Sequence, residues 1–313
     1  MLQTVVVVVG VIVVLKIFFK YTTGKHEILE DLNGRIILIT GATSGIGQYC
    51  AQELAKHGAF VHLLCRNKLK AEQTADTIRR ETGNSNVYVW SVDVSSLKSV
   101  REFAERFLAQ TSHPIDVLIN NAGIGWLEDR CVTEDGLEIT MATNHFGHFL
   151  LTNLLLDRLK QAKQGRIVNI SSCLHWFAWP DMDDLNFERS YDRRNVYHIS
   201  KLCNILHTNA LAERLSATDV TANSLHPGVI KTPLFRTWTG GMALLYYMGW
   251  PFYKNVEEGS QTTLYAATAP ELANVSGSYF ADCGTALKSP LARSKRLAAQ
   301  LWQYSERVTS VQE

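Results

Sequence analysis

Tyr197 and Lys201 are the first residues whose types and spacing could support catalysis. They are four positions apart in a segment predicted to be helical, so both side chains lie on one face of that helix. A tyrosine phenol normally titrates near pH ~10, and a neighbouring ammonium favours the ionised form and lowers that pKa. The pair could therefore exchange a proton with a substrate near neutral pH. Ser171 and Ser172 end a predicted strand upstream, and one of their hydroxyls could lie beside the phenol.

A glycine-rich segment between a predicted strand and a predicted helix could bind a phosphate group. Glycines there permit a tight turn and a close approach of the backbone to a pyrophosphate, and the helix N-terminus supplies free N–H groups. The segment therefore predicts a dinucleotide site, with a simple strand–helix turn as the alternative. The contacts are expected from Gly41, Thr43, Ser44, Gly45, Ile46 and Gly47.

The end of the second predicted strand indicates which dinucleotide would bind. Enzymes that use NAD usually carry an acidic residue about 20 positions after the glycine-rich loop, where it binds the ribose 2′-hydroxyl. Here this place holds Cys65, and Arg66 follows it. A guanidinium attracts a 2′-phosphate. The sequence thus favours NADP(H) over NAD(H), although Arg66 could instead belong to a surface turn.

From Arg35 onward, short apolar segments alternate with helical patterns. The apolar segments carry few polar residues at alternate positions, which is typical of a parallel sheet covered on both faces. The alternation predicts an α/β fold of the Rossmann type, with a doubly wound parallel sheet in a single domain. Strands are expected at 35–40, 60–65, 87–92, 117–120, 166–171 and 220–226, and helices at about 45–57, 68–82, 96–111, 134–160 and 197–216.

The composition excludes several classes of protein. Lys and Arg number 31 and Asp and Glu 30, which gives a net charge of +1 over 313 residues and no electrostatic footprint for nucleic acid. With 46% hydrophobic residues the chain can form a large core. The six cysteines show neither CxxC nor zinc-site spacing, so we expect no disulfide framework, no metal site and a reducing compartment.

The first 20 residues differ from this average. The apolar run from Leu2 to Phe19 has close to the ~20 residues that a membrane-spanning helix needs. A cleaved signal peptide or a buried strand is the alternative, but nothing basic precedes the run. Lys16, Lys20 and Lys25 lie at its end or after it, which by the positive-inside rule places the rest of the chain in the cytosol.

We therefore expect three parts of the chain. They are an N-terminal membrane-anchor helix over residues 1–20, in contact with the lipid bilayer, a polar tether over 21–33, and one catalytic domain over 34–313. Within that domain, residues 228–260 are expected to form an irregular, aromatic-rich insertion on the substrate side, which could cover the site or touch the bilayer.

Taken together, these motifs occur in the order seen in short-chain dehydrogenases/reductases, and the chain resembles that family from about Arg35 to Thr232. Within the family it is similar to the microsomal retinol dehydrogenase group. The motifs of the family are TGATSGIG, Asp93-Val94, Asn120–Gly123, Asn144, Ser171-Ser172, Tyr197 with Lys201, and Pro227-Gly228. Those of the group are the N-terminal anchor, Cys65-Arg66-Asn67, residues 144–152 and residues 277–283.

The resemblance implies a role for each catalytic residue. Tyr197 would be the general acid in carbonyl reduction and the base in alcohol oxidation. Lys201 would bind the nicotinamide ribose and lower the pKa of Tyr197. Ser172, with Ser171 as the alternative, would bind the substrate oxygen by a hydrogen bond. Asn144 would hold a water that connects Lys201 to solvent.

The resemblance also implies the remaining cofactor contacts. Asp93 and Val94 would contact the adenine, and the segment after the fourth strand would line its ribose. The residues of that segment are Asn120, Ala122 and Gly123, and those around the nicotinamide are Pro227, Gly228, Val229 and Thr232, with Thr232 near the carboxamide.

The function implied is interconversion of a hydrophobic alcohol and its aldehyde or ketone, with retinol and retinaldehyde as the specific pair. Reduction would be favoured in a cell where NADPH exceeds NADP, and the enzyme would sit on the endoplasmic reticulum facing the cytosol. A hydroxysteroid or a lipid-derived aldehyde is the alternative substrate. A non-catalytic nucleotide-sensing membrane scaffold is the alternative of another class, and the complete catalytic set argues against it. No sequence feature indicates an oligomeric state.

Two smaller features remain. The segment Cys173–Val196 is longer than in many members of the family, and its aromatic residues could line a lipid pocket or pack against the sheet. His145 and His148 flank Gly147, but no third metal ligand is evident, so we expect them to be packed or hydrogen-bonded.

Overall fold

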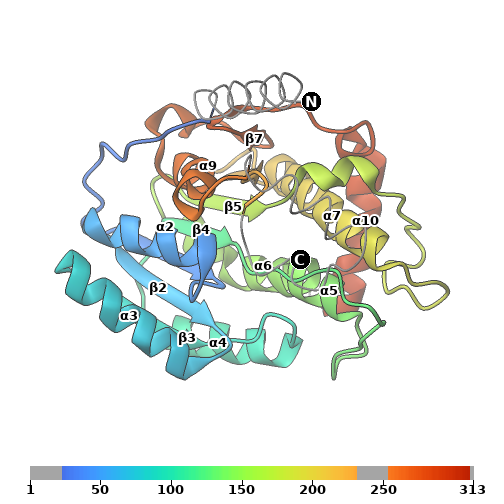
Figure 1. Cartoon of the computed structure of the whole chain (residues 1–313), viewed down its shortest axis with the longest axis horizontal. Coiled ribbons are helices and arrows are strands. Elements are labelled where there is room, and N and C mark those ends of the chain that lie inside the picture. Colours follow the sequence, from blue (N-terminus) through green and yellow to red (C-terminus); the bar gives the residue numbers. More distant parts are fainter. Residues whose placement is uncertain (1–22, 231–252, 311–313) are drawn as a thin grey trace, which may run out of the picture.

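The computed structural model describes residues 23–230 and 253–310, and within them the strands form a single sheet (Figure 1). The strand order is β3-β2-β1-β4-β5-β6-β7-β8, and every neighbouring pair is parallel except β7 with β8. The strands are β1 (Ile36–Thr40), β2 (Phe60–Cys65), β3 (Val87–Ser91), β4 (Val117–Asn120), β5 (Arg166–Ile170), β6 (Thr221–His226), β7 (Tyr279–Ala281) and β8 (Gly284–Thr285).

Helices connect the parallel strands and cover both faces of the sheet. They are α2 (Gly45–Lys56), α3 (Lys68–Thr82), α4 (Leu97–Gln110), α5 (Ile139–Met141), the π-helix η1 (Ala142–Phe146), α6 (Gly147–Lys160), the 3-10 helix η2 (Cys173–Phe177), α7 (Arg193–Arg214), α9 (Val256–Thr268) and α10 (Lys295–Thr309), with 3-10 turns η5 (Pro270–Leu272) and η6 (Leu291–Arg293). The doubly wound α/β fold predicted from the sequence is confirmed.

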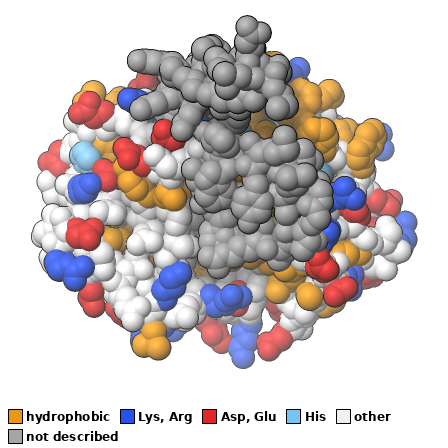
Figure 2. Space-filling view, viewed as in Figure 1, with side chains coloured by type: hydrophobic (Ala, Val, Ile, Leu, Met, Phe, Trp, Pro, Cys, Tyr) orange, Lys and Arg blue, Asp and Glu red, His pale blue; other side chains and the backbone are white. Residues whose placement is uncertain are grey.

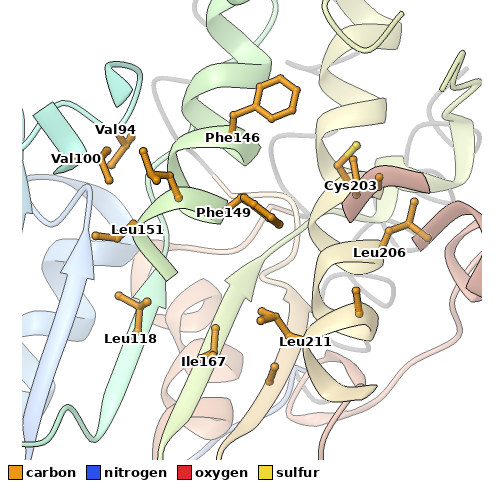
Figure 3. Close-up of a cluster of buried hydrophobic side chains, with 14 of the residues drawn as sticks. Val94, Val100, Leu118, Phe146, Phe149, Leu151, Ile167, Cys203, Leu206 and Leu211 are labelled. Atoms are coloured by element: carbon orange, nitrogen blue, oxygen red, sulfur yellow. The ribbon is translucent and has the colours of Figure 1, made fainter. Parts of the chain in front are cut away.

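Alternate residues of the strands enter two separate cores. Ile36 and Leu38 of β1 belong to a cluster with α4, α6, α7 and α10, which Figure 3 shows in part. Ile37 and Ile39 belong to a second cluster with α2, α3 and α9. Because both faces are covered, every residue of β1 is buried, which explains why the strand sequences are apolar throughout.

The strand order determines where a ligand can bind. From β1 the sheet grows towards β2 and β3 on one side and towards β4, β5 and β6 on the other. The connections therefore diverge between β1 and β4, and the carboxyl ends of these strands form a crevice of the kind that binds ligands in open α/β sheets. Most predicted site residues follow the carboxyl ends of strands β1 to β6, whereas Asn144 lies in η1 and Tyr197 and Lys201 lie in α7.

Two predicted segments differ from the structure. The predicted helix 134–160 begins only at Ile139, because Gly136 has a φ of +76° and Val132 forms an antiparallel bridge with Glu138. Within the predicted insertion 228–260, residues from Val256 onward belong to α9, which begins with a capping box on Asn255. Residues 231–252 lie outside the described parts of the chain.

The predicted polar tether, over its described residues, packs on the α/β domain. The backbone N–H of His26 donates to Gln261 Oε1 on α9 at 2.9 Å, and its ring Nε2 lies 2.8 Å from Thr268 Oγ1. Ile28 and Leu32 are buried in the second core. The predicted anchor, residues 1–20, lies outside the described residues, and across 23–230 and 253–310 no helix has the length and apolarity to cross a membrane. On the face seen in Figure 2, acidic and basic side chains are interspersed.

Candidate active site

The predicted catalytic side chains meet where β5 ends against α7. Tyr197 and Lys201 lie one turn apart in α7, and Ser172 is the N-cap residue of η2, two residues beyond β5. All three are buried. The Lys201 ammonium lies 5.6 Å from the centre of the Tyr197 ring, and the phenol is hydrogen-bonded to Ser172. The structure thus brings together the phenol, the ammonium and one serine hydroxyl.

The two adjacent serines have different partners, which separates their roles. Ser171 Oγ donates to the backbone carbonyl of Lys201 at 2.6 Å, so it fastens α7 to the end of β5. Ser172 Oγ accepts from the N–H of Leu174 at 3.2 Å and also bonds Tyr197. Of the two serines, Ser172 is thus the one whose hydroxyl interacts with the phenol, and its contact with a substrate oxygen stays a prediction.

Burial shifts the pKa values of Tyr197 and Lys201 in opposite directions. Burial raises the pKa of the Tyr197 phenol well above its ordinary value, and the hydrogen bond with Ser172 lowers it only in part. Burial lowers the pKa of Lys201 to about 8, and its ammonium donates to the Ile170 carbonyl at 3.2 Å. Desolvation is the largest cause of the shift at Tyr197, and the lowering of the phenol pKa by Lys201 stays a prediction.

Asn144 lies in the π-helix η1, which presents it to the segment after β4. Its Nδ2 donates to the Ile124 carbonyl at 2.8 Å and to Ser200 Oγ at 2.9 Å, while its Oδ1 accepts from the Ile124 N–H at 2.9 Å. A Cβ on Gly123 would lie 3.4 Å from both Asn144 Oδ1 and Lys201 Nζ. The absence of that carbon keeps open the space between the amide and the ammonium.

Directly after the π-helix lies a second glycine, at a position where close packing leaves no space for a side chain. Gly147 begins α6, and a Cβ there would lie 1.7 Å from the carbonyl oxygen of Val94. The loop after β3 can therefore press directly against the start of α6. This contact holds Asp93 and Val94, the predicted adenine contacts, next to the helix that carries Asn144.

The glycine-rich loop has the geometry that a pyrophosphate requires. Gly41 has a φ of +67°, and a Cβ on it would lie 2.9 Å from Ala122 Cα, so neither the turn nor the packing tolerates a side chain. Gly47 packs equally closely, its Cβ position lying 2.5 Å from Asn121 Nδ2. The side chain of Ser44, the N-cap of α2, makes no capping hydrogen bond there, and the first turn of α2 has no acidic residue. The N–H groups of Gly45, Ile46 and Gly47 are thus those that a phosphate would use. Thr43, also predicted as a contact, precedes them in this loop.

The end of β2 carries an exposed positive charge, as expected for a site that would bind a 2′-phosphate. Cys65 is buried, whereas the Arg66 side chain is 77% exposed. Its Nη1 lies 4.0 Å from Asp93 Oδ2, across the ends of β2 and β3. The guanidinium and the predicted adenine contact are therefore neighbours, as the sequence-based assignment of both to the adenosine end requires.

Asn120 and Asn121 play different roles from those expected of the motif. The Asn120 side chain lies in the core, donating to Asn169 Oδ1 at 2.8 Å and to Thr152 Oγ1 at 3.0 Å. Asn121 has no role of its own among the predicted cofactor contacts. Its Nδ2 nevertheless donates to the carbonyl of Thr40 at 2.8 Å and so braces the glycine-rich loop. The alternation of side chains along an extended segment was the signal that could have separated the two.

The residues predicted to surround the nicotinamide follow β6. Pro227 follows β6, Gly228 has a φ of +94°, and Val229 is exposed. Ile230 forms a parallel bridge with Lys254, which closes the base of the segment between them. Thr232 lies outside the described residues.

The two histidines near Asn144 are hydrogen-bonded within the core. His145 Nε2 lies 2.8 Å from Ser305 Oγ, and His148 Nε2 lies 2.9 Å from Thr40 Oγ1. The Thr40 hydroxyl accepts from the N–H of Asn121 at 2.9 Å, so His148 supports the end of β1. The structural interpretation of both residues is confirmed.

Comparisons with known proteins agree with this geometry. The family described as short chain dehydrogenase matches residues 35–242. Human retinol dehydrogenase 12 is 44% identical over 275 residues, covering 88% of this chain and 86% of the relative.

Solved structures of other proteins are similar to this chain in fold. An uncharacterised protein from Mycobacterium paratuberculosis has a TM-score of 0.73 and 34% identity, covering 91% of this chain and 96% of its own. A blue fluorescent protein from a metagenomic library, solved with NADPH, has a TM-score of 0.63 and 27% identity, covering 80% and 97%.

Proposed function

Since the chain belongs to the short-chain dehydrogenase family, we propose that it is an NADP(H)-dependent oxidoreductase that reduces a hydrophobic aldehyde, with retinaldehyde as its substrate. The observation that carries the proposal is the buried arrangement of Tyr197, Ser172 and Lys201 at the carboxyl end of the sheet. A scaffold that only senses nucleotides has no need of a phenol hydrogen-bonded to a serine there.

Tyr197 acts as the proton donor. Because its pKa is raised, the phenol is protonated at neutral pH, and a protonated phenol is the form that carbonyl reduction requires. The bound nicotinamide supplies the hydride for the carbonyl carbon. Tyr197 gives its proton to the carbonyl oxygen, which becomes the alcohol hydroxyl, while Ser172 donates a hydrogen bond to that oxygen.

Lys201 and Asn144 support the same proton transfer from Tyr197. With a pKa near 8 the lysine is mostly cationic at pH 7, so it can bind ribose hydroxyls and stabilise the phenolate left after proton donation. The gap that Gly123 leaves between the ammonium and the Asn144 amide would admit a water that returns a proton to Tyr197.

The preference for NADP(H) rests on Arg66 and on the lack of an acid at Cys65. The NADPH bound to the metagenomic relative is consistent with it. The retinoid substrate follows from the similarity to retinol dehydrogenase 12. Residues 1–20 would anchor the enzyme in the endoplasmic reticulum with its catalytic domain in the cytosol, close to a substrate dissolved in the membrane.

A substrate panel on the full-length protein in detergent tests the proposal. Retinaldehyde, a ketosteroid and a medium-chain aldehyde are each assayed with NADPH and NADH. Retinaldehyde with NADPH should give the highest kcat/KM, and a higher value for the steroid would reject the retinoid assignment. Tyr197→Phe should abolish reduction while leaving NADPH affinity nearly unchanged, and an active variant would contradict the proton path.

A further inference from the structure

Three segments of the chain meet at one rim of the sheet, the edge formed by the carboxyl ends of its parallel strands. The described chain begins beside Asp282, whose Oδ1 accepts from the Gly24 N–H at 3.3 Å. The same Oδ1 bonds Lys254 Nζ at 2.6 Å, where the chain returns after residue 252. Asp282 follows β7, whose Ala281 pairs with His226 of β6. Residues 1–22 and 231–252 therefore both join the domain at the carboxyl ends of β6 and β7.

An aromatic turn, residues 176–179, lies at the next strand along this rim. It follows β5 and the catalytic Ser172, and it exposes three large rings: Trp176 is 47% exposed, Phe177 60% and Trp179 81%. In Figure 1 the yellow-green segment after β5 lies at the upper right, and Figure 2 shows hydrophobic side chains gathered at that side. Rings with this exposure can contact a surface outside the domain.

The backbone of the aromatic turn is firmly held. Trp179 N–H donates to Asn195 Oδ1 at 3.1 Å, and Asn195 Nδ2 donates back to the Trp179 carbonyl at 3.3 Å. His175 is fully buried; its Nε2 accepts from the Ser289 N–H at 3.1 Å, so its Nδ1 carries the proton and donates to the Ser172 carbonyl at 2.7 Å. The exposed rings are thus presented by a fixed support that continues into the catalytic serine.

We propose that the aromatic turn of residues 176–179 inserts into the headgroup region of a lipid bilayer and holds the rim of the active site against it. The 22 residues that precede Thr23 include the apolar run Leu2–Phe19, and they join the domain at this same rim. Tryptophan is enriched at membrane interfaces, and tryptophan and phenylalanine both occur on the lipid-facing side of interfacial segments.

This contact deepens the proposed function, on which its enzymatic consequence rests. A substrate dissolved in the bilayer would reach Ser172 and Tyr197 without crossing water, because the turn that touches lipid is continuous with the serine. The lipid contact itself needs no turnover, so the two can be tested separately.

Tryptophan quenching tests the lipid contact. The full-length protein is reconstituted into phosphatidylcholine vesicles with brominated acyl chains, and the quenched fraction of its fluorescence is compared with that in ordinary vesicles. The W176F/W179F variant keeps the turn apolar but removes two fluorophores, and should lose a distinct part of the quenching. Trp302→Phe, which removes a buried indole on α10, should leave the quenched signal unchanged and is the matched control.

The outcome that overturns the proposal is equal quenched signal in W176F/W179F and wild type. A change confined to the oligomeric state, with quenching unaltered, would assign the turn to a second copy of the chain and overturn it as well. Thermal unfolding of each variant checks that it folds.

Steady-state kinetics test whether the aromatic turn delivers a substrate from the bilayer to the active site. In vesicles, the W176S/F177S/W179S variant should raise KM for retinaldehyde by at least about threefold, with kcat and the KM for a short water-soluble aldehyde unchanged. Leu69→Ser changes a residue that is 79% exposed on α3, which packs on β2 and β3 at one end of the sheet and away from β5; it should leave all three constants unchanged. An unchanged retinaldehyde KM rejects delivery through the turn. Absence of turnover with every aldehyde would reject the proposed function while leaving the quenching result intact.

Discussion

Reversing the charge at Arg66 should change which dinucleotide the enzyme uses. A hydrogen bond to a charged group contributes about 1.5–3 kcal/mol, and a factor of ten corresponds to about 1.4 kcal/mol, so losing the guanidinium costs NADPH roughly 10- to 100-fold. Because the Arg66 side chain is 77% exposed, solvent screening favours the lower half of that range. In Arg66→Asp the new carboxylate also repels the 2′-phosphate, and it can accept a hydrogen bond from the 2′-hydroxyl of NADH.

The assay is kcat/KM for NADPH and for NADH with one aldehyde. Arg66→Asp should lower the NADPH:NADH ratio by at least about tenfold, and Arg66→Gln, which removes the charge without reversing it, should fall between that variant and the wild type. Arg80→Asp makes the same charge change in the last turn of α3 and should leave the ratio unaltered. A ratio that is unchanged in Arg66→Asp would show that the 2′-phosphate is bound elsewhere.

Three further predictions concern the support of the site. Gly41→Ala forces a φ of +67° on alanine and a contact of 2.9 Å with Ala122 Cα, so NADPH affinity should fall and Tm drop by several degrees; an unchanged affinity in isothermal titration would contradict this. His175→Phe removes two buried hydrogen bonds and should lower kcat, with Tm falling by an amount that corresponds to about 2 kcal/mol; retained kcat would show a merely structural role. Burial lowers the pKa of His145 to about 3 and of His148 to about 4, so the unfolded chain takes up protons first as pH falls below 6.5. Stability should be full above 6.5 and decline by on the order of 2 kcal/mol per histidine by pH 5, and equal urea midpoints at pH 7.5 and 5 would refute this.

The regular part of the fold was predictable because its periodicity is strong. The β1 and β4 segments were predicted to within a residue, since a strand buried on both faces must be apolar throughout. The helix starting near 134 was misplaced because its first residues look helical locally, yet Gly136 adopts a positive φ and the chain closes a bridge between Val132 and Glu138. Such a bridge depends on residues that become neighbours only in the folded chain.

The site residues were predictable by type and order, but their orientation was not. Sequence spacing could place Tyr197 with Lys201, since both lie on one helix, but it could not supply the desolvation that raises the pKa of the phenol. The π-helix was also missed, because one additional residue in a helical turn leaves no mark in the hydrophobic pattern. Asn120 and Asn121 are the same residue type; side-chain alternation predicts that they face opposite ways, but only the folded sheet shows that Asn120 faces the core and Asn121 the glycine-rich loop.

The course of residues 24–32 has a mechanical consequence. This segment is fastened at Gly24 to Asp282, at His26 to α9, and at Leu32, whose N–H donates to the His57 carbonyl at 2.9 Å. A pull on the chain that precedes Gly24 must break these hydrogen bonds one after another before the force reaches Ile36, the first residue of β1. The hydrogen bonds of residues 24–32 therefore protect the register of β1, the strand between β2 and β4, against a force applied to the N-terminal end of the chain.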